Sequence, residues 1–219
     1  MTDILLRHQV INTALALGRL GLNKGTAGNI SVRTGDGFLI TPSGVPAEKL
    51  CPADIVLMEF DGTVIGRRAP SSEWRFHFDI LLSRPELGAV IHTHAPYCTT
   101  LAVMGRPIPA FHYMVAVAGG RDIRCAPYAT FGTPELCAGA VKAMEGRRAC
   151  LLAQHGMIAA GETLDKALKL TIEVEDLARV YWQALQIGEP PLLDDGEMDR
   201  VLEKFKTYGR PQPMPPKAD

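Results

Sequence analysis

Two histidines stand two residues apart in the apolar stretch AVIHTHA, residues 89–95. In a β-strand, positions i and i+2 point to the same face, and two steps of about 3.3 Å place the His92 and His94 backbones roughly 6.6 Å apart. Both rings can then reach one metal ion with bonds of about 2.0–2.1 Å. A third histidine, His155, follows another short apolar run. Three neutral imidazoles with an open fourth position are the usual ligands of a catalytic zinc ion.

These residues also have a plainer interpretation. Each histidine could belong to a half-buried strand and be satisfied by one hydrogen bond. The spacing of His92 and His94 fits both interpretations, whereas His155 taken alone favours the plainer one. Glu73 also has two interpretations. It could complement a helix dipole or, beside a metal, act as a ligand or a proton-transfer group.

Three short loops carry the chemistry of a phosphate site. They are Thr26-Ala27-Gly28-Asn29, Ser43-Gly44 and Ser71-Ser72. Backbone N–H groups and hydroxyls that converge can bind a phosphate without a lysine. Taken singly, each loop is an ordinary turn or helix cap.

Length and composition indicate one globular domain of a cytoplasmic protein. The chain has 219 residues, 47% of them hydrophobic, and a net charge of −1. That is enough to bury a full core, and it offers no basic excess for nucleic acid or an anionic membrane. No apolar run approaches the roughly 20 residues that span a bilayer, and no signal peptide is recognisable. The five cysteines form no Cys-x-x-Cys pair, which indicates reduced thiols.

The elements that position these residues follow from the hydrophobic spacing. Turn signals predict antiparallel hairpins within residues 25–44 and 54–66, and strands that end at His92–His94 and at His155. Helices are predicted over residues 4–20, 71–84, 134–144, 165–185 and 194–205, with a short one ending near Met104. A serine is expected to cap the helix over 71–84. Residues 107–133 form a long irregular segment, which in a compact domain is more often functional or interfacial than idle.

A series of motifs resembles the class II aldolases of the aldolase/adducin family, and within it the aldolases that act on L-fuculose 1-phosphate. The motifs are GTAGNISV, ITPSG, PSSEWRFH, HTHAPYCT, FHYMVAVAGG, CAPYATFGT, AQHGMIA and EKFKTYG. They cover one domain over residues 1–209 and leave a Pro-rich tail at 210–219. The resemblance implies an α/β fold, a three-layer α/β/α sandwich with a central, mostly antiparallel sheet. It also implies a homotetramer with active sites at the subunit interfaces.

The resemblance implies a role for each matching residue. One Zn²⁺ per subunit would be held by His92, His94, His155 and, at rest, Glu73. The catalytic groups would be Glu73 and Tyr113, the latter entering the site of the adjacent subunit. The aldehyde end would be shaped by Phe131 and Tyr208. The phosphate would be bound by Thr26, Gly28, Asn29, Ser43, Gly44, Ser71 and Ser72.

One position near the metal departs from the fuculose enzymes. Gln154 stands where they have a further histidine, a change that leaves the ligand set intact but alters the groups around it.

The implied reaction is the reversible cleavage of a ketose 1-phosphate to dihydroxyacetone phosphate and an aldehyde. L-fuculose 1-phosphate, 5-deoxyribulose 1-phosphate and 5-methylthioribulose 1-phosphate all fit this scheme. In it, Glu73 handles the proton at C3 and Tyr113 the proton of the C4 hydroxyl.

Three alternatives remain at this point. A ribulose-phosphate 4-epimerase of the same family would carry aspartate at position 73. A methylthioribulose-1-phosphate dehydratase would eliminate water and give no dihydroxyacetone phosphate. An adducin-like interaction module would use the fold without catalysis and would have no use for an open metal site.

Overall fold

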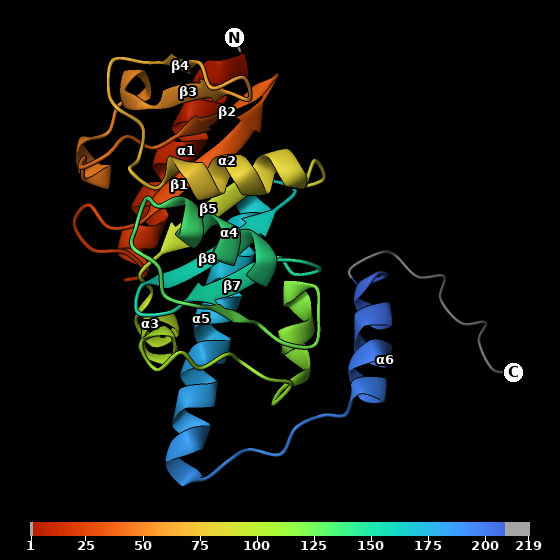
Figure 1. Cartoon of the computed structure of the whole chain (residues 1–219). Coiled ribbons are helices and arrows are strands. Elements are labelled where there is room, and N and C mark those ends of the chain that lie inside the picture. Colours follow the sequence, from red (N-terminus) through yellow and green to blue (C-terminus); the bar gives the residue numbers. More distant parts are fainter. Residues whose placement is uncertain (1, 209–219) are drawn as a thin grey trace, which may run out of the picture.

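A single eight-stranded sheet organises the protein in the computed structural model, which describes residues 2–208. The strand order is β4-β3-β2-β1-β5-β8-β7-β6 (Figure 1). Within the described residues, β6 and β7 pair in parallel and the other neighbours pair antiparallel. The strands are β1 (Asn29–Thr34), β2 (Gly37–Ile40), β3 (Val56–Glu59), β4 (Val64–Ile65), β5 (Ala89–Thr93), β6 (Cys125–Ala126), β7 (Ala149–Leu152) and β8 (Gly156–Gly161). The predicted Pro-rich tail at 210–219 lies outside the described residues.

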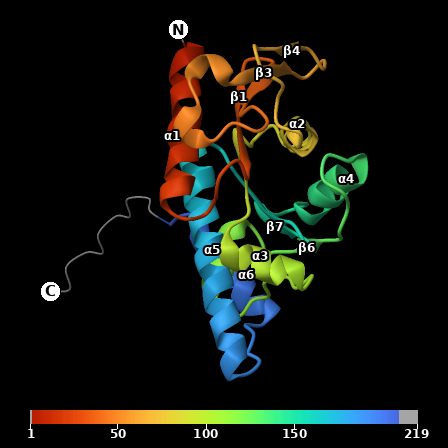
Figure 2. The same ribbon diagram turned by 90° about the vertical axis from the view of Figure 1, so that its left-hand side faces the viewer.

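Helices cover both faces of the sheet, as the edge-on view in Figure 2 shows. One face is covered by α1 (Thr2–Arg19), α3 (Pro96–Val103), α5 (Leu164–Ile187), α6 (Asp195–Phe205) and the 3₁₀ segment η3 (Tyr113–Ala118). The other face is covered by α2 (Trp74–Ser83) and α4 (Pro134–Ala143). Two further 3₁₀ turns are η1 (Ala47–Lys49) and η2 (Pro52–Asp54). The expected three-layer α/β/α arrangement around a mostly antiparallel sheet is therefore confirmed.

Alternation along the central strands decides which side chains reach which layer. In β1, Ile30 and Val32 enter the core under α1 and α5. Asn29 and Ser31 point the opposite way, towards α2, and both are buried. In β5, Ile91 points into the core under α1 and α5. His92 points to the opposite face of the sheet, where its ring contacts Phe76 of α2. Strands β1 and β5 therefore place the polar side chains of Asn29, Ser31 and His92 on the face of the sheet that α2 covers.

The predicted helices agree with the structure to within a few residues at each end. The expected serine cap of α2 is wrong: the helix begins at Trp74, and its N-cap position is held by Glu73, whose side chain makes no capping bond. Ser71 Oγ instead accepts the Glu73 N–H at 3.3 Å. The helix start is thus organised to turn Glu73 away from the helix and towards β1.

The irregular segment 107–133 contains more structure than its sequence predicts. It forms η3 and then β6, which pairs Cys125 with Leu151 and Ala126 with Leu152 of β7. A two-residue strand is too short for its hydrophobic periodicity to be recognised in the sequence.

No helix in the described part of the chain is long and apolar enough to cross a membrane.

Candidate active site

Three histidines meet where β5 and β8 lie side by side. His92 is in β5, His94 comes just after it, and His155 sits in the tight connection between β7 and β8. Their ring centroids are 4.7–5.1 Å apart, and one ring nitrogen from each lies within 4.8 Å of the others. His92 is buried, His155 half-buried and His94 exposed, so the cluster opens on one side. A single ion can contact all three rings from that side.

The histidine protonation states suit metal binding. His92 Nδ1 lies 2.9 Å from the Met157 carbonyl oxygen, to which it can only donate, so Nε2 carries the free lone pair. That Nε2 points into the cluster, 3.1 Å from His94 Nε2. Burial lowers the pKa of His92 to about 4 and also lowers the pKa of His94. Both rings are therefore neutral at pH 7, as ligation requires.

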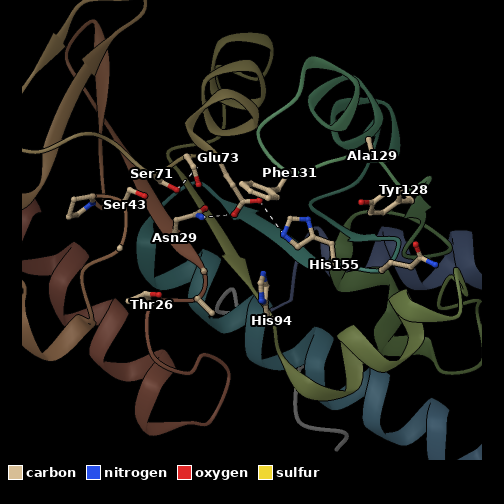
Figure 3. A pocket seen from close by; sticks show the side chains of 16 residues that line it. Thr26, Asn29, Ser43, Ser71, Glu73, His94, Tyr128, Ala129, Phe131 and His155 are labelled. Atoms are coloured by element: carbon tan, nitrogen blue, oxygen red, sulfur yellow. Dashed lines mark hydrogen bonds and ion pairs between the residues drawn. The ribbon is translucent and has the colours of Figure 1, made fainter.

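Glu73 completes the cluster from the start of α2. Its Oε2 lies 3.3 Å from His92 Nε2. Its Oε1 lies 3.1 Å from His155 Nε2, a contact marked in Figure 3. Burial alone raises the pKa of Glu73, but the contact with His155, the proximity of His92 and a hydrogen bond from Asn29 together lower it to about 2. The carboxylate is thus ionised while 8% exposed.

This donor set fits a divalent metal. Glu73 Oε1 is buried and has no well-formed hydrogen bond, although it faces a ring nitrogen at 3.1 Å. A buried anionic oxygen without a donor needs a positive partner. Three imidazole nitrogens and one carboxylate oxygen around a common point are ligands that Zn²⁺ accepts in tetrahedral geometry. The buried carboxylate, more than the spacing of the histidines, distinguishes this cluster from three ordinary core histidines.

A cavity of about 380 Å³ opens beside the cluster. Figure 3 places Ser43, Ser71 and Thr26 on one side of it, Glu73, His94 and His155 in the middle, and Tyr128 on the other side. Among the described residues, neither lysine nor arginine lines this cavity. The lining residues are Thr26, Ala27, Gly28, Asn29, Pro42, Ser43, Gly44, Ser71, Ser72, Glu73, His94, Tyr128, Ala129, Phe131, Gln154 and His155.

The loop before β1 is held against the histidine cluster at Gly28. Gly28 has φ +74°, and a Cβ there would lie 2.3 Å from Asn23 Nδ2 and 2.6 Å from the His92 carbonyl oxygen. Asn23 Oδ1 also accepts the His94 N–H at 3.3 Å. The hydroxyl-bearing loop and the histidine strand are therefore fixed to each other through one amide and one glycine.

The structure brings most of the predicted site residues into this one cavity. All seven predicted phosphate residues line it, together with Glu73, His94, His155 and Phe131, and His92 lies beneath them. Tyr113 and Tyr208 do not. They line a separate groove of about 660 Å³ between η3 and α6, where they are 51% and 82% exposed.

Several residues of the site were not predicted from the sequence. Tyr128 and Ala129 line the cavity, and Gln154, noted only as a departure, also lines it and has φ +55°. Asn23 and His77 lie behind it. His77 stands one helical turn after Glu73, a signal visible in the sequence, but its contacts depend on strands far away in the chain.

The family of the chain is indicated by a sequence model and by close relatives. The model of the class II aldolase and adducin N-terminal domain matches residues 8–182. A 5-methylthioribulose-1-phosphate/5-deoxyribulose-1-phosphate aldolase of Rhodospirillum rubrum is 64% identical over 212 residues, which are 97% of this chain and 96% of the relative. An L-fuculose phosphate aldolase of Escherichia coli is 54% identical over 205 residues, 93% of this chain and 95% of the relative.

The fold agrees with this similarity. A solved structure of an L-fuculose 1-phosphate aldolase superposes with a TM-score of 0.90 at 44% identity, covering 94% of this chain and 97% of that one.

Proposed function

The chain belongs to the class II aldolase and adducin family, and we propose that this aldolase cleaves 5-methylthioribulose 1-phosphate and 5-deoxyribulose 1-phosphate. The observation that carries the reaction type is the buried Glu73 carboxylate set against three histidines at the centre of a hydroxyl-lined cavity. The choice of substrates is supported by 64% identity to a relative named for both compounds, against 54% to one named for fuculose phosphate.

The lining of the cavity supports the same choice. The candidate substrates share the phosphate, the C2 carbonyl and the C3 and C4 hydroxyls, and they differ beyond C4. There, L-fuculose 1-phosphate carries another hydroxyl, whereas the proposed substrates end in a methyl or a methylthio group. The side of the cavity away from the serines holds Tyr128 and Ala129. The Tyr128 ring and the Ala129 methyl group can contact an apolar tail, which supports the deoxy and methylthio compounds as substrates.

The phosphate is proposed to bind at the serine side. Thr26, Ser43, Ser71 and Ser72 offer hydroxyls there, and the glycines allow close approach of backbone N–H groups. Asn29, also in the lining, can offer an amide N–H. With no lysine or arginine among the described lining residues, binding depends on these neutral donors.

We propose that His92, His94 and His155 hold one zinc ion per chain, with Glu73 as fourth ligand at rest. A bound zinc ion would act as a Lewis acid on the substrate carbonyl. Glu73 is suited to serve next as the acid and base at C3. Burial is the largest influence on its pKa and acts upward, so a carboxylate that leaves the imidazoles but stays buried becomes a better base.

Tyr113 is proposed to work in the site of another subunit. It lies outside its own cavity and is half exposed, on a groove rich in apolar residues from η3 and α6. In a homotetramer with sites at the subunit interfaces, its phenol would take the C4 hydroxyl proton as the C3–C4 bond breaks. Tyr208, on the same groove, would approach the aldehyde end with it.

One assay panel tests the proposal. Purified protein is given the three sugar phosphates, with and without added zinc and after chelation, and release of dihydroxyacetone phosphate is measured. We expect kcat/KM to be highest for the methylthio and deoxy compounds, and activity to be lost on chelation and restored by zinc. Faster cleavage of fuculose 1-phosphate would overturn the substrate assignment. Loss of water without dihydroxyacetone phosphate would indicate a dehydratase instead.

A further inference from the structure

A fully buried imidazole lies directly behind the proposed active site. His77, in α2, is 0% exposed and does not line the cavity. Its Nε2 lies 2.5 Å from Asn29 Oδ1, and its Nδ1 lies 2.7 Å from Ser31 Oγ. Asn29 and Ser31 are alternate residues of β1 and so face α2 together. One ring therefore contacts two neighbouring polar side chains of the same strand.

The hydrogen bonds run in one direction only. Asn29 Nδ2 lies 2.9 Å from Glu73 Oε2, and an ionised carboxylate can only accept, so Nδ2 is the donor. The other end of that amide, Oδ1, must accept, and His77 Nε2 must carry the proton. A neutral ring then leaves Nδ1 as an acceptor for the Ser31 hydroxyl. Burial lowers the pKa of His77 to about 3, consistent with a neutral ring.

The alternative is a histidine that merely fills the core. His77 does stack on Phe76, with ring centroids 4.7 Å apart. Packing alone, however, does not require both ring nitrogens to have partners on the same strand. A buried imidazole also loses its hydration, which an apolar side chain of similar size would not. The pairing of both nitrogens accounts for a histidine at this position.

These hydrogen bonds matter because the side-chain amide of an asparagine can rotate by 180° and exchange the positions of its oxygen and nitrogen. Rotation by 180° would set Oδ1 against the Glu73 carboxylate, which is repulsive, and would also replace a donor with an acceptor on a residue that lines the cavity. A proton fixed on His77 Nε2 opposes that rotation, since it needs an acceptor on the facing atom.

We propose that His77 is a positioning residue that locks the Asn29 amide with Nδ2 towards Glu73 and so fixes the proposed proton-transfer group. The role rests on the proposed function, because it acts through Glu73 and Asn29. Ser31 has the supporting task of holding the tautomer from the far side of the ring. Hydrogen bonds link Ser31 to His77, His77 to Asn29, and Asn29 to Glu73. Each bond fixes the orientation of the next side chain, and no proton needs to move between them.

A matched pair of substitutions separates this role from packing. In His77→Gln, the amide nitrogen stands at the same branch as Nε2 and can still donate to Asn29. In His77→Asn, the amide stands at the branch of Nδ1, where it can meet Ser31 but not Asn29. Both remove the aromatic ring, and both are expected to lower the melting temperature.

The readout is proton exchange at C3 of dihydroxyacetone phosphate by zinc-loaded protein. We expect kcat for exchange to fall at least about tenfold in His77→Asn and to stay within about threefold of wild type in His77→Gln. Zinc content should be equal in both. Equal exchange rates in the two variants at equal zinc content would overturn the positioning role, because packing loss alone would then explain them.

A second measurement does not depend on activity. In ¹⁵N-labelled wild-type protein, the ring nitrogen shifts and couplings of His77 report which nitrogen carries the proton. We expect the Nε2–H form, with reduced occupancy of that form in Ser31→Ala. The Nδ1–H form would overturn the proposal even if a variant failed to fold. Wild-type protein that shows the Nε2–H form but exchanges no C3 proton would refute the proposed function and leave the orientation of Asn29 standing.

Discussion

Glu73 presents its two carboxylate oxygens to different partners. Oε2 receives the Asn29 amide, and Oε1 faces His155 without a well-formed hydrogen bond. Glu73→Gln keeps the size of the side chain but removes its ability to take a proton. We expect zinc content to stay near one per chain, while C3 proton exchange falls by a factor on the order of 10² or more. An unchanged exchange rate would remove Glu73 from proton transfer.

Gly28 tests whether the hydroxyl-bearing loop must lie against the histidine strand. In Gly28→Ala the new Cβ meets the His92 carbonyl oxygen at 2.6 Å, so backbone must shift. We expect KM for the sugar phosphate to rise by about tenfold or more, because the loop and the strand move apart.

Gly25→Ala is the matched control for Gly28→Ala. Gly25 lies in the same loop with φ +61°, but a Cβ there meets nothing within 4 Å. It therefore carries the left-handed backbone strain of about 1–2 kcal/mol without the collision. If both variants raise KM equally, strain rather than close approach is responsible.

At the scale of elements, α3 is anchored by a carboxylate from α5. The N–H groups of Tyr97 and Cys98, in the first turn of α3, donate to Glu175 Oε1 and Oε2, each at 2.9 Å. Ala95, the N-cap residue, provides no side-chain cap. Because α3 starts two residues after His94, this anchor also holds the exposed histidine of the proposed metal site.

Removing that anchor should weaken both the fold and the proposed metal site. We expect Glu175→Ala to lower the free energy of unfolding of zinc-free protein by about 3 kcal/mol, since two charge-assisted bonds are lost. Zinc affinity, measured by equilibrium dialysis, should fall as well. Asp176→Ala, a change at the exposed neighbouring residue, should stay within about 0.5 kcal/mol of wild type. A comparable loss in both variants would show that α5 tolerates substitution poorly in general.

The sequence predicts helices and strands well where their hydrophobic pattern extends over many consecutive residues. The hairpin of β1 and β2 follows from alternation around a Gly-Asp-Gly turn, and α5 from sustained helical spacing. The His92–His94 pair likewise needs only strand geometry. The two-residue β6 and the misplaced serine cap of α2 depend instead on pairing with β7 and on Glu73 turning towards Asn29. Those are tertiary preferences, which override local propensity.

The site was predictable only in part for the same reason. The motifs that resemble a family place most cavity residues correctly, although their individual roles stay predictions. His77 is the last residue of the motif PSSEWRFH, but neither that motif nor its own helix indicates contact with Asn29 and Ser31, residues more than 40 positions earlier. The contacts of His77 can be recognised only when the structure shows which face of β1 packs against α2.

For the whole molecule, buried neutral histidines predict how stability depends on pH. His77 has its pKa lowered to about 3 by burial, and an unfolded histidine titrates near 6.5. Between these values the unfolded chain binds a proton that the folded chain does not, so stability falls as pH falls. His92, with a pKa of about 4, adds to this in metal-free protein. Each group contributes a slope of about 1.4 kcal/mol per pH unit.

Urea unfolding of metal-free protein at pH 5.0, 5.5 and 6.0 measures that slope. This window lies above the ordinary pKa of carboxyl groups, so Glu73, whose pKa is lowered to about 2, contributes little slope there. His77→Gln should reduce the slope by close to one proton, whatever its effect on stability at pH 7. An unchanged slope would mean that His77 is protonated in the folded protein.

Tyr113 is half exposed on the groove between η3 and α6, outside the cavity of its own chain, so its proposed role in the reaction requires a second subunit. If the phenol serves the C4 hydroxyl in a neighbouring site, Tyr113→Phe should impair carbon–carbon cleavage at least about tenfold and leave C3 proton exchange largely intact. His94→Ala should impair both reactions, since it removes a proposed metal ligand. Mixing the two inactive variants and letting subunits re-associate should then restore part of the cleavage activity, because mixed oligomers contain sites with an intact histidine cluster and an intact Tyr113. Mixed oligomers that form but regain no activity would place Tyr113 in its own subunit's chemistry or in none.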